Sequence, residues 1–495
     1  MYISVSPDYM KKMEQEAFRQ GESGEQLMEN AARASLEYIK KEYAEYMPDA
    51  KILIVCGAGN NGGDGLALAR LFSQEKFNTY VYITGEPKTR EAKNNFERLK
   101  NTSATILEEL PDEKTMQESH FSIIVDAIFG TGFHGKPKDK TAEAIIKINK
   151  IGAPIISLDI PSGVEGLTGK TEDIFVKADS TITFGSPKHG LYLNPDGAAG
   201  KITTADIGLP KHLPTRDIET TDAVTITETT DLKFLVPKRK PFGYKGDFGR
   251  VLLYAGSFGM AGAAVVAAQA AIKSGAGLTY VLCEKGIADI LQIAVPNAIC
   301  VEKAPANTSV MAFGCGINEN EKSWLSILNL FDKNIPSIWD AGALNLLAKK
   351  PIKLGCNAII TPHIGEAARL LGKTNEEIAG DMFSAVKDLS LKYDCNVMLK
   401  GVSTLMYDGK QCAIQPGGVP ALAKGGSGDA LVGILAAVCA QQKEFKPMPA
   451  MQAAAAWLNA AGKYETRRQG EYSPTSLDIV NSLGYALLET HKNIV

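Results

Sequence analysis

The sequence predicts an α/β protein with two domains, each built on a parallel sheet that helices cover on both faces. Its 495 residues are more than a single hydrophobic core usually holds. Short branched-aliphatic runs alternate with charged helical stretches, which is the pattern of strands buried on both faces. The alternation stops in a stretch rich in proline, threonine and charge around residues 210–225, and then resumes. We therefore expect domains over residues 1–215 and 225–495.

In the first half, an amphipathic helix over residues 21–43 leads into the alternating pattern. Five strands are expected, each ending at a glycine or a polar turn: KILIVCG, TYVYITG, SIIVDAIFG, PIISLDIPSG and STITFGSPK. The second half repeats the pattern with RVLLYAGS, LTYVLC, SVMAFGCG, IPSIWDAGALN, NAIITPH and NVMLKG. The last third is rich in alanine and predicts three long helices.

Composition argues against several classes of function. A net charge of −3 gives no reason to expect nucleic acid or an acidic membrane surface as a partner. No apolar run reaches the roughly 18 residues that a membrane-spanning helix needs. The first residues lack the basic and apolar regions of a secretory signal, so a cytoplasmic location is expected. The eight cysteines form no C-x-x-C pair, which favours buried, reduced thiols.

Three polar loops in the first half follow predicted strands, at the edge where parallel sheets bind ligands. The first is the glycine-rich loop over residues 57–65, whose glycines would let a ligand approach the backbone. A helix expected to begin near Gly63 would point free N–H groups at an anion. The second loop follows Asp126, and the third carries Asp159 and Ser162.

Asn61, Asp126 and Ser162 are expected to face one crevice, where they offer an amide oxygen, a carboxylate and a hydroxyl. Such hard oxygen donors suit potassium better than zinc. Asp159 is then left as a carboxylate that can move a proton. The alternative is that Asp126 and Asp159 only cap turns or helix starts.

In this order, GNNGGDG, DAIFGTG and LDIPSG resemble the NAD(P)H-hydrate epimerase family, over about residues 5–210. The resemblance implies a Rossmann-like αβα sandwich that interconverts the R and S epimers of hydrated NADH and NADPH. It implies K⁺ at Asn61, Asp126 and Ser162, and catalysis by Asp159. His134 or Lys136 would be the cationic partner of Asp159, although His134 can also be a plain loop residue. Ligand contacts are implied for Asn60, Asn61, Gly62, Gly63, Asp64, Gly130, Thr131, Gly132, Phe133, His134, Gly135, Lys136 and Asp159.

The second half carries a glycine run, KGGSGD, before a long alanine-rich helix. The N–H groups of Gly426, Ser427 and Gly428 could form an anion hole at the positive end of that helix. Asp429 could deprotonate a hydroxyl that attacks a phosphoryl group, or could simply cap the helix. This layout resembles the ribokinase-like superfamily, which implies a ribokinase-like αβα domain.

TPHIGE and VMLKGVST narrow the resemblance to ADP- or ATP-dependent NAD(P)H-hydrate dehydratases, over about residues 225–490. The resemblance implies Mg²⁺, ADP as the phosphoryl donor, and Asp429 as the base. Nucleotide contacts are implied for Lys400, Gly401, Val402, Ser403, Thr404 and Gly428. Contacts with the hydrate are implied for Ala263, Gly316, His363 and Asp429, although His363 can also be a helix-capping residue. FGCGINE and DAGALN depart from the GPGLG and DADALN of many relatives, which leaves nucleotide choice and magnesium handling open.

Both halves together resemble bifunctional enzymes that repair hydrated nicotinamide cofactors. The expected partners are small molecules, NADHX or NADPHX and ADP, and the family suggests a homo-oligomer. Two other functions stay open. The first half could only bind its ligand, as related domains of RNA-decapping scaffolds do. The second half could be a small-alcohol kinase, such as a vitamin-precursor kinase, which would accumulate a stable phosphate ester.

Overall fold

The structure is a computed structural model that describes residues 1–111, 120–210, 221–239 and 241–492. The chain divides into two compact units. One unit is Ile3–Val224, and the other is Thr225–Val495 together with Met1–Tyr2. The expected end of the first domain at residue 215 lies outside the described residues. No helix in the described part of the chain is long and apolar enough to cross a membrane.

The first unit contains a seven-stranded parallel sheet in the order β4-β3-β2-β5-β6-β7-β8. The five strands predicted from the sequence are present, and β4 and β8 extend the sheet at its two edges. The bounds are β2 (Lys51–Cys56), β3 (Asn78–Ile83), β4 (Thr105–Leu107), β5 (Ile123–Ala127), β6 (Ile155–Leu158), β7 (Ser180–Phe184) and β8 (Lys201–Ala205). A short strand, β1 (Tyr2–Val5), opens the chain.

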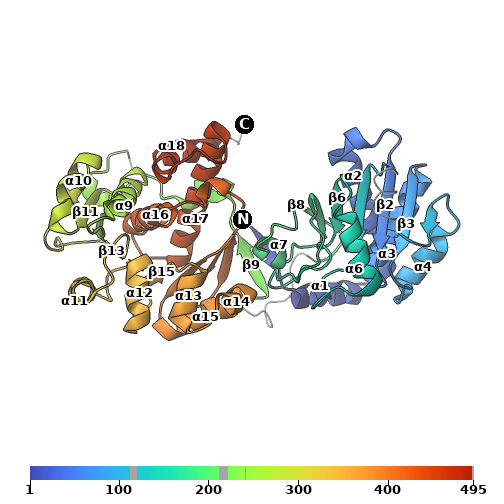
Figure 1. The fold of residues 1–495 in the computed structure, drawn as a ribbon, viewed down its shortest axis with the longest axis horizontal. Helices are drawn as coiled ribbons and strands as arrows, with labels where there is room; N and C mark the ends of the chain where they lie inside the picture. The colour runs from blue at the N-terminus through green and yellow to red at the C-terminus, as the bar shows by residue number, and fades with distance from the viewer. Residues whose placement is uncertain (112–119, 211–220, 240, 493–495) are drawn as a thin grey trace. The chain divides into compact units, whose positions relative to one another are not determined.

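Helices cover both faces of this sheet, as the apolar runs predicted (Figure 1). Along β2, Ile52 and Ile54 pack with α2 and α3, whereas Leu53 and Val55 pack with α6. Successive strand residues point to opposite faces, so a strand buried on both sides needs apolar residues throughout. The helices are α1 (Pro7–Arg19), α2 (Gly24–Glu42), α3 (Asn60–Gln74), α4 (Arg90–Leu99), α6 (Asp139–Ile148) and α7 (Gly190–Leu193).

The strand order reverses between β2 and β5. The chain runs outward from β2 through β3 to β4, and then returns to the other side of β2. Loops that leave two such neighbouring parallel strands diverge and open a crevice at their carboxyl ends. The glycine-rich loop and the loop after Asp126 therefore meet in one place.

The predicted start of α3 near Gly63 is wrong by about one turn, because α3 begins at Asn60 with Gly59 as its N-cap. The glycines inside the helix are required by close packing. A Cβ on Gly65 would lie 2.5 Å from the Ala127 side chain, and one on Gly62 would overlap the Gly57 carbonyl oxygen. Gly59 faces open space instead. These glycines thus bring α3 close to the sheet, which the sequence pattern alone did not predict.

The second unit contains a larger sheet in the order β9-β18-β17-β16-β15-β14-β13-β10-β11-β12. Strands from β16 to β12 in this order are parallel, and β16, β17 and β18 form an antiparallel meander. The six predicted strands are present. The bounds are β9 (Ala223–Ile226), β10 (Arg250–Tyr254), β11 (Leu278–Leu282), β12 (Ile299–Cys300), β13 (Val310–Phe313), β14 (Ser337–Trp339), β15 (Ala358–Ile360), β16 (Asn396–Lys400), β17 (Thr404–Tyr407) and β18 (Cys412–Gln415).

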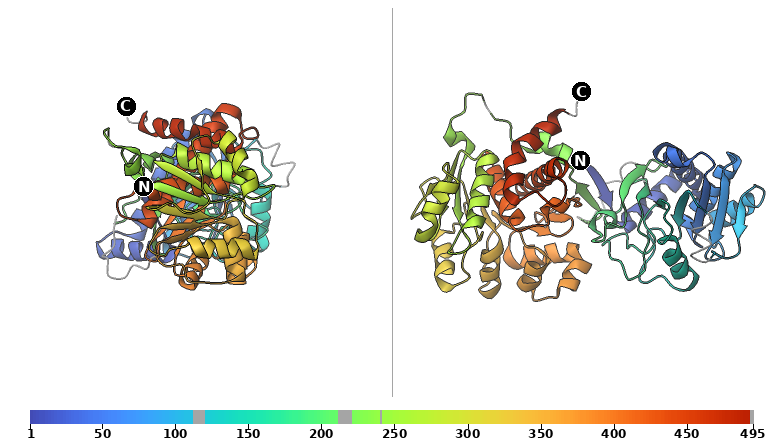
Figure 2. Two further views of the ribbon diagram at one scale, coloured as in Figure 1. Left: turned by 90° about the vertical axis from the view of Figure 1, so that its left-hand side faces the viewer. Right: turned by 45° about the horizontal axis from the view of Figure 1, so that its top comes forward.

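Helices again form two outer layers (Figures 1 and 2). The alanine-rich helices gather on one side, together with α18 (Ser476–Lys492): they are α9 (Ala261–Lys273), α16 (Ser427–Gln441) and α17 (Pro447–Gln469). The other side carries α12 (Ala341–Lys349), α13 (Ile364–Leu371), α14 (Asn375–Gly380) and α15 (Met382–Tyr393). The remaining helices are α8 (Leu232–Leu235), α10 (Ala288–Ala294) and α11 (Glu321–Leu330). The strand order reverses between β10 and β13, so the loops after these strands meet at a second crevice.

Candidate active sites

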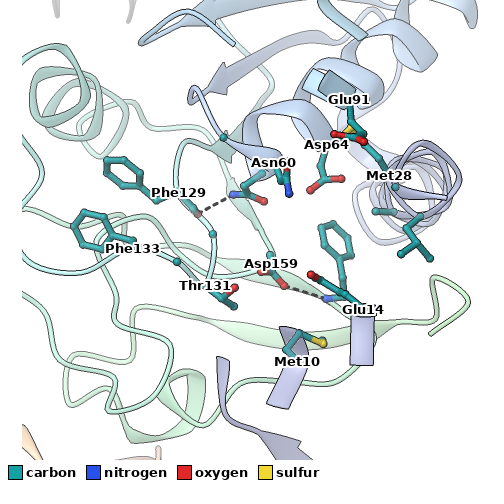
Figure 3. Close-up of a pocket in the computed structure, with 18 of the residues that line it drawn as sticks. Met10, Glu14, Met28, Asn60, Asp64, Glu91, Phe129, Thr131, Phe133 and Asp159 are labelled. Carbon is teal, nitrogen blue, oxygen red and sulfur yellow. Dashed lines mark hydrogen bonds between the residues drawn. The ribbon is translucent and has the colours of Figure 1, made fainter. Parts of the chain in front are cut away.

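A cavity of about 860 Å³ lies beyond the carboxyl ends of β2, β5, β6 and β7, with α1 and α2 in its wall (Figure 3). Most of the ligand-binding residues predicted for the first unit line it. They are Asn60, Asn61, Asp64, Gly130, Thr131, Gly132, Phe133, His134 and Asp159. Gly62, Gly63, Gly135 and Lys136 are not among its lining residues. Sequence and structure thus converge on one pocket large enough for a cofactor fragment.

Asp126 lies fully buried at the end of β5, and its carboxylate is held by four hydrogen bonds. The Ser157 hydroxyl donates at 2.8 Å, the Ser162 N–H at 2.8 Å, the Ser162 hydroxyl at 2.6 Å and the Ile128 N–H at 3.2 Å. Burial raises the pKa of Asp126, and these hydrogen bonds oppose the rise. Asp126 and Ser162 are therefore adjacent, but both are fully buried and neither is among the residues that line the cavity, so their place in a cation site stays a prediction.

Among Asn61, Asp126 and Ser162, Asn61 is the residue whose side-chain oxygen has no hydrogen-bond partner in the described part of the chain. Its side-chain N–H₂ donates to the carbonyls of Phe129 at 2.8 Å and Leu158 at 3.1 Å, which fixes the orientation of the amide. Its Oδ1 is buried and has no hydrogen-bond partner among the described residues. A buried polar atom normally has a partner, so this oxygen indicates a place for a bound cation or donor.

Asp159 follows β6 in the left-handed backbone region, with φ of 66°. Its carboxylate forms an ion pair with the Lys188 ammonium group. Lys188 follows β7 and is only 1% exposed. Its Nζ also donates to the Thr183 hydroxyl and the Phe184 carbonyl, each at 3.1 Å. The three N–H groups of this buried ammonium group therefore each have an acceptor within the protein.

The cation beside Asp159 is thus Lys188, and neither of the two predicted cations occupies that place. His134 contacts Glu165, with 3.0 Å between Nδ1 and Oε1, and its side chain is exposed. Lys136 is also exposed and pairs with Asp173 at 3.0 Å. Lys188 was not predicted as a site residue, although it is the last residue of the predicted run STITFGSPK, at the edge of the sheet that binds ligands.

In the second unit, Asp429 lies in the first turn of α16, after Gly426 at φ of 92°. Burial raises the pKa of Asp429 to about 6; Asp340 adds to the rise, whereas a hydrogen bond with Cys315 and the charge of Lys400 oppose it. Ligand atoms of Cys315, Asp340 and Asp429 all lie within 4.8 Å of one another. A carboxyl with such a pKa is half ionised close to neutral pH, which suits a general base.

Lys400 ends β16 and forms an ion pair with Asp340, with 2.6 Å between Nζ and Oδ1. The Thr361 hydroxyl donates to the same oxygen at 2.7 Å. Burial alone would lower the pKa of Lys400, but the negative charges of Asp340 and Glu366 and the hydrogen bond to Asp340 together outweigh it, and the pKa is raised. A Cβ on Gly428 would lie 3.6 Å from Lys400 Nζ and 3.7 Å from Asp340 Oδ2. Lys400, Asp340 and the start of α16 therefore meet at one point.

The other residues predicted for this unit lie around the same strand ends. Gly316 adopts φ of 65°, and a Cβ there would lie 2.8 Å from the Ala263 side chain. Gly401 and Val402 form the exposed turn after β16, Thr404 begins β17, and the Ser403 hydroxyl accepts from the Gly417 N–H at 3.0 Å.

His363 is the N-cap of α13. Its Nδ1 accepts from the Gly365 N–H at 3.0 Å, and its own N–H donates to Glu366 at 2.8 Å. The capping role considered for His363 from the sequence is thus present. The ring is exposed, and its Nε2 lies 3.6 Å from the carboxylate of the buried Glu366.

The two units define an α/β enzyme with one small-molecule site in each half. Residues 24–190 match the family model described as the YjeF-related protein N-terminus. Residues 251–482 match the model described as NAD(P)H-hydrate dehydratase. Taken together, the matches and the relatives below show that the chain belongs to the family of bifunctional NAD(P)H-hydrate repair enzymes.

The relatives match nearly the whole chain. The bifunctional NAD(P)H-hydrate repair enzyme of Coxiella burnetii is 33% identical over 88% of this chain and 89% of its own length. That of Moorella thermoacetica is 32% identical over 94% of this chain and 93% of its own. A solved ADP/ATP-dependent NAD(P)H-hydrate dehydratase from Bacillus subtilis, co-crystallised with ATP and Mg²⁺, is 25% identical with a TM-score of 0.49. It covers 54% of this chain and 99% of its own.

Proposed function

We propose that the chain repairs hydrated NADH and NADPH in two steps. The first unit interconverts the R and S epimers, and the second dehydrates the S epimer at the expense of ADP, with release of AMP and phosphate. The observation that carries the proposal is the pair of carboxylates at the two strand crevices. Asp159 lies beside Lys188 in one crevice, and Asp429 lies beside Lys400 and Asp340 in the other.

In the second unit, the ring hydroxyl must first become a better leaving group, because hydroxide leaves poorly and phosphate leaves well. Asp429 accepts the hydroxyl proton as that oxygen attacks the terminal phosphoryl group of the nucleotide. The N–H groups at the start of α16 and the Lys400 ammonium face the phosphates. The Ser427 hydroxyl, which has no partner among the described residues, is a further donor for them.

Different residues support the two proposed cofactors, Mg²⁺ and K⁺. For Mg²⁺, the carboxylates of Asp340 and Asp429 are the hard oxygen donors that the ion prefers, and it would neutralise phosphate charge. For K⁺, the support is the unpartnered Asn61 Oδ1, which belongs to a residue that lines the cavity; Asp126 and Ser162, the other two proposed ligands, are buried and hydrogen-bonded to each other. Exchange of K⁺ for tetramethylammonium is expected to slow epimerisation and to leave dehydration of the pure S epimer unchanged.

Recovery of NADH absorbance tests the whole proposal. The substrate is a mixture of the R and S hydrates of NADH, with K⁺, Mg²⁺ and ADP or ATP. Wild type is expected to restore all the NADH, and Asp429→Asn none. Asp159→Asn is expected to restore the S fraction quickly and the rest only at the rate of spontaneous epimerisation.

The two other functions give different results. A small-alcohol kinase would yield no NADH with either nucleotide and would accumulate a phosphate ester. A first unit that only binds would leave wild type and Asp159→Asn alike. The ion pair of Asp159 with the buried Lys188 favours catalysis over binding alone, because it holds a charged carboxylate in the cavity. A cytoplasmic location and a homo-oligomer stay predictions, and sedimentation tests the second.

A further inference from the structure

A second carboxyl group enters the cavity of the first unit from a different wall. Asp64 lies on α3 and Asp159 follows β6, and both side chains point into the cavity (Figure 3). Asp159 has a cationic partner in Lys188. Asp64 is half-buried and makes no hydrogen bond or ion pair with any residue in the described ranges. The two carboxyl groups therefore share a cavity but differ in what stabilises their charge.

The surroundings of Asp64 disfavour its ionised form. Burial raises its pKa well above the ordinary value, and the charges of Asp159 and Glu14 raise it further, whereas Lys188 opposes the rise. Glu14 itself, on α1, has a raised pKa because of burial and the charge of Asp159. The other charged or titratable side chains that line the cavity are Lys88, Glu91 and His134. The cavity thus favours the neutral form of Asp64, whereas the Asp159 carboxylate is paired with the Lys188 ammonium group. Two carboxyls with opposed environments are the usual arrangement of an acid and a base.

Epimerisation of the hydrate needs both groups at once. Water adds to NADH at a ring carbon bonded to the ring nitrogen, because that carbon becomes electrophilic when the enamine is protonated. The product is a hemiaminal, whose stereocentre bears a hydroxyl and a nitrogen. Its configuration can invert only after one bond to that carbon breaks, and a base alone leaves negative charge on the departing atom.

We propose that Asp64 is the proton donor of the epimerase reaction and acts opposite the Asp159 base. The inference rests on the epimerase activity proposed above. Asp159 takes the proton of the ring hydroxyl, and the carbon–oxygen bond becomes a carbonyl. The carbon–nitrogen bond breaks, its electron pair goes to nitrogen, and that nitrogen takes the proton of Asp64. The carbonyl rotates, and the reverse steps on its other face return both protons and close the ring as the second epimer.

The test follows conversion of the purified R hydrate of NADH to the S hydrate by chromatography. The assay contains K⁺ but no nucleotide, so that the second unit cannot dehydrate the product. Asp64→Asn is expected to lower kcat by about 10²–10⁴-fold, the usual contribution of a general acid, with a smaller change in KM. Asp64→Glu, which can still carry a proton, is expected to recover part of the rate. The control is Glu86→Gln, an exposed carboxylate outside the cavity, which is expected to keep the wild-type rate.

The pH profile separates proton donation from a structural role. In wild type, kcat is expected to fall as pH rises through the raised pKa of Asp64, since the donor is then lost. The residual rate of Asp64→Asn is expected to lack this fall. Thermal unfolding and dehydration of the S hydrate serve as checks that the variants fold.

Three results would overturn the inference. They are an Asp64→Asn rate within about threefold of wild type, a higher KM with unchanged kcat, and an unchanged pH profile. Each would leave Asp64 as a binding residue at most. Wild type that fails to epimerise would instead overturn the proposed function, so the two failures are distinguishable.

Discussion

Asp429 shows at the scale of one residue how burial prepares a side chain for chemistry. Its half-buried carboxyl has a pKa of about 6, and a hydrogen bond with the Cys315 thiol holds this value below what burial alone would give. The cysteine thus lies beside the proposed base and favours its ionised form.

Dehydration should therefore depend on pH in a defined direction. We expect kcat/KM for the S hydrate to fall as pH drops through about 6, because the base becomes protonated. Cys315→Ala removes a hydrogen bond that favours the ionised form, so the acid limb should move to higher pH. Initial rates across a pH series, with nucleotide and Mg²⁺ saturating, measure the acid limbs of wild type and of Cys315→Ala. A limb that moves to lower pH in Cys315→Ala would contradict this account.

The same carboxyl should cost stability. Its folded pKa is raised from 3.8 to about 6, so its favourable contribution to folding is present below pH 3.8 and is lost as pH rises through 6. Asp429→Asn should consequently gain about 1–3 kcal/mol of unfolding free energy relative to wild type between pH 4 and pH 7. Urea unfolding of both proteins at the two pH values tests this, and a constant difference between them would argue against a buried, ionised Asp429.

Residue-scale prediction from the sequence succeeded where the residues lie close to a motif. Asp126 and Ser162 could be grouped because they lie at the carboxyl ends of the neighbouring parallel strands β5 and β6, whereas Asn61 as a third ligand stays a prediction. Lys188 could not be assigned to Asp159, because their meeting depends on β6 and β7 being neighbours and on the turn that buries the lysine. His134 and Lys136 are nearer to the motif in the sequence, yet both point to surface acids.

At the scale of elements, α3 illustrates how a motif can serve packing as well as binding. Its glycines allow the helix to approach β2 and β5, which holds the Asn61 amide against the carbonyls at the ends of neighbouring strands. The close packing of α3 on the sheet therefore also fixes the position of the unpartnered Asn61 Oδ1.

Gly65→Ala should destabilise the first unit by about 1–3 kcal/mol, because the added methyl would overlap the side chains of Ala127 and Cys56. The matched control is Gly59→Ala, whose added methyl meets nothing within 4 Å. Because Gly59 is the N-cap of α3, where alanine is a poorer residue than glycine, its effect should be about 0.5–1 kcal/mol and smaller than that of Gly65→Ala. Chemical unfolding with a probe in the first unit compares the two. Equal destabilisation would show that the glycines do not act through packing.

Strands were the elements best predicted from the sequence, because burial on both faces leaves a run of apolar residues that needs no tertiary information. The start of α3 was misplaced because glycine is a poor helix former, and only the close contacts of the folded unit explain its presence there. The hairpin of β17 and β18 was not separated in the sequence, since its strands have only four residues each.

At the scale of the whole molecule, two units with separate cores carry two steps of one repair process. The first step supplies the epimer that the second consumes. The hydrate is a small molecule, and the second unit accepts it whichever chain produced it if the intermediate passes through solution.

Variants of the two sites should therefore complement one another. A mixture of Asp159→Asn and Asp429→Asn chains should restore all the NADH from mixed R and S hydrates, although neither chain does so quickly alone. The yield and rate at several protein concentrations measure this. If the mixture converts the R hydrate no faster than Asp159→Asn alone, the hydrate must pass between the units of a single chain.

The left-handed backbone of Asp159 restricts which residues can replace it in a relative that has lost epimerase activity. At φ of 66°, asparagine and glycine fit readily, whereas most other residues are strained. An inactive descendant would thus carry asparagine or glycine at this position and keep its fold and cavity. The identity of this single residue can therefore mark which members of a genome's repertoire still perform repair and which have been retained only to hold a ligand.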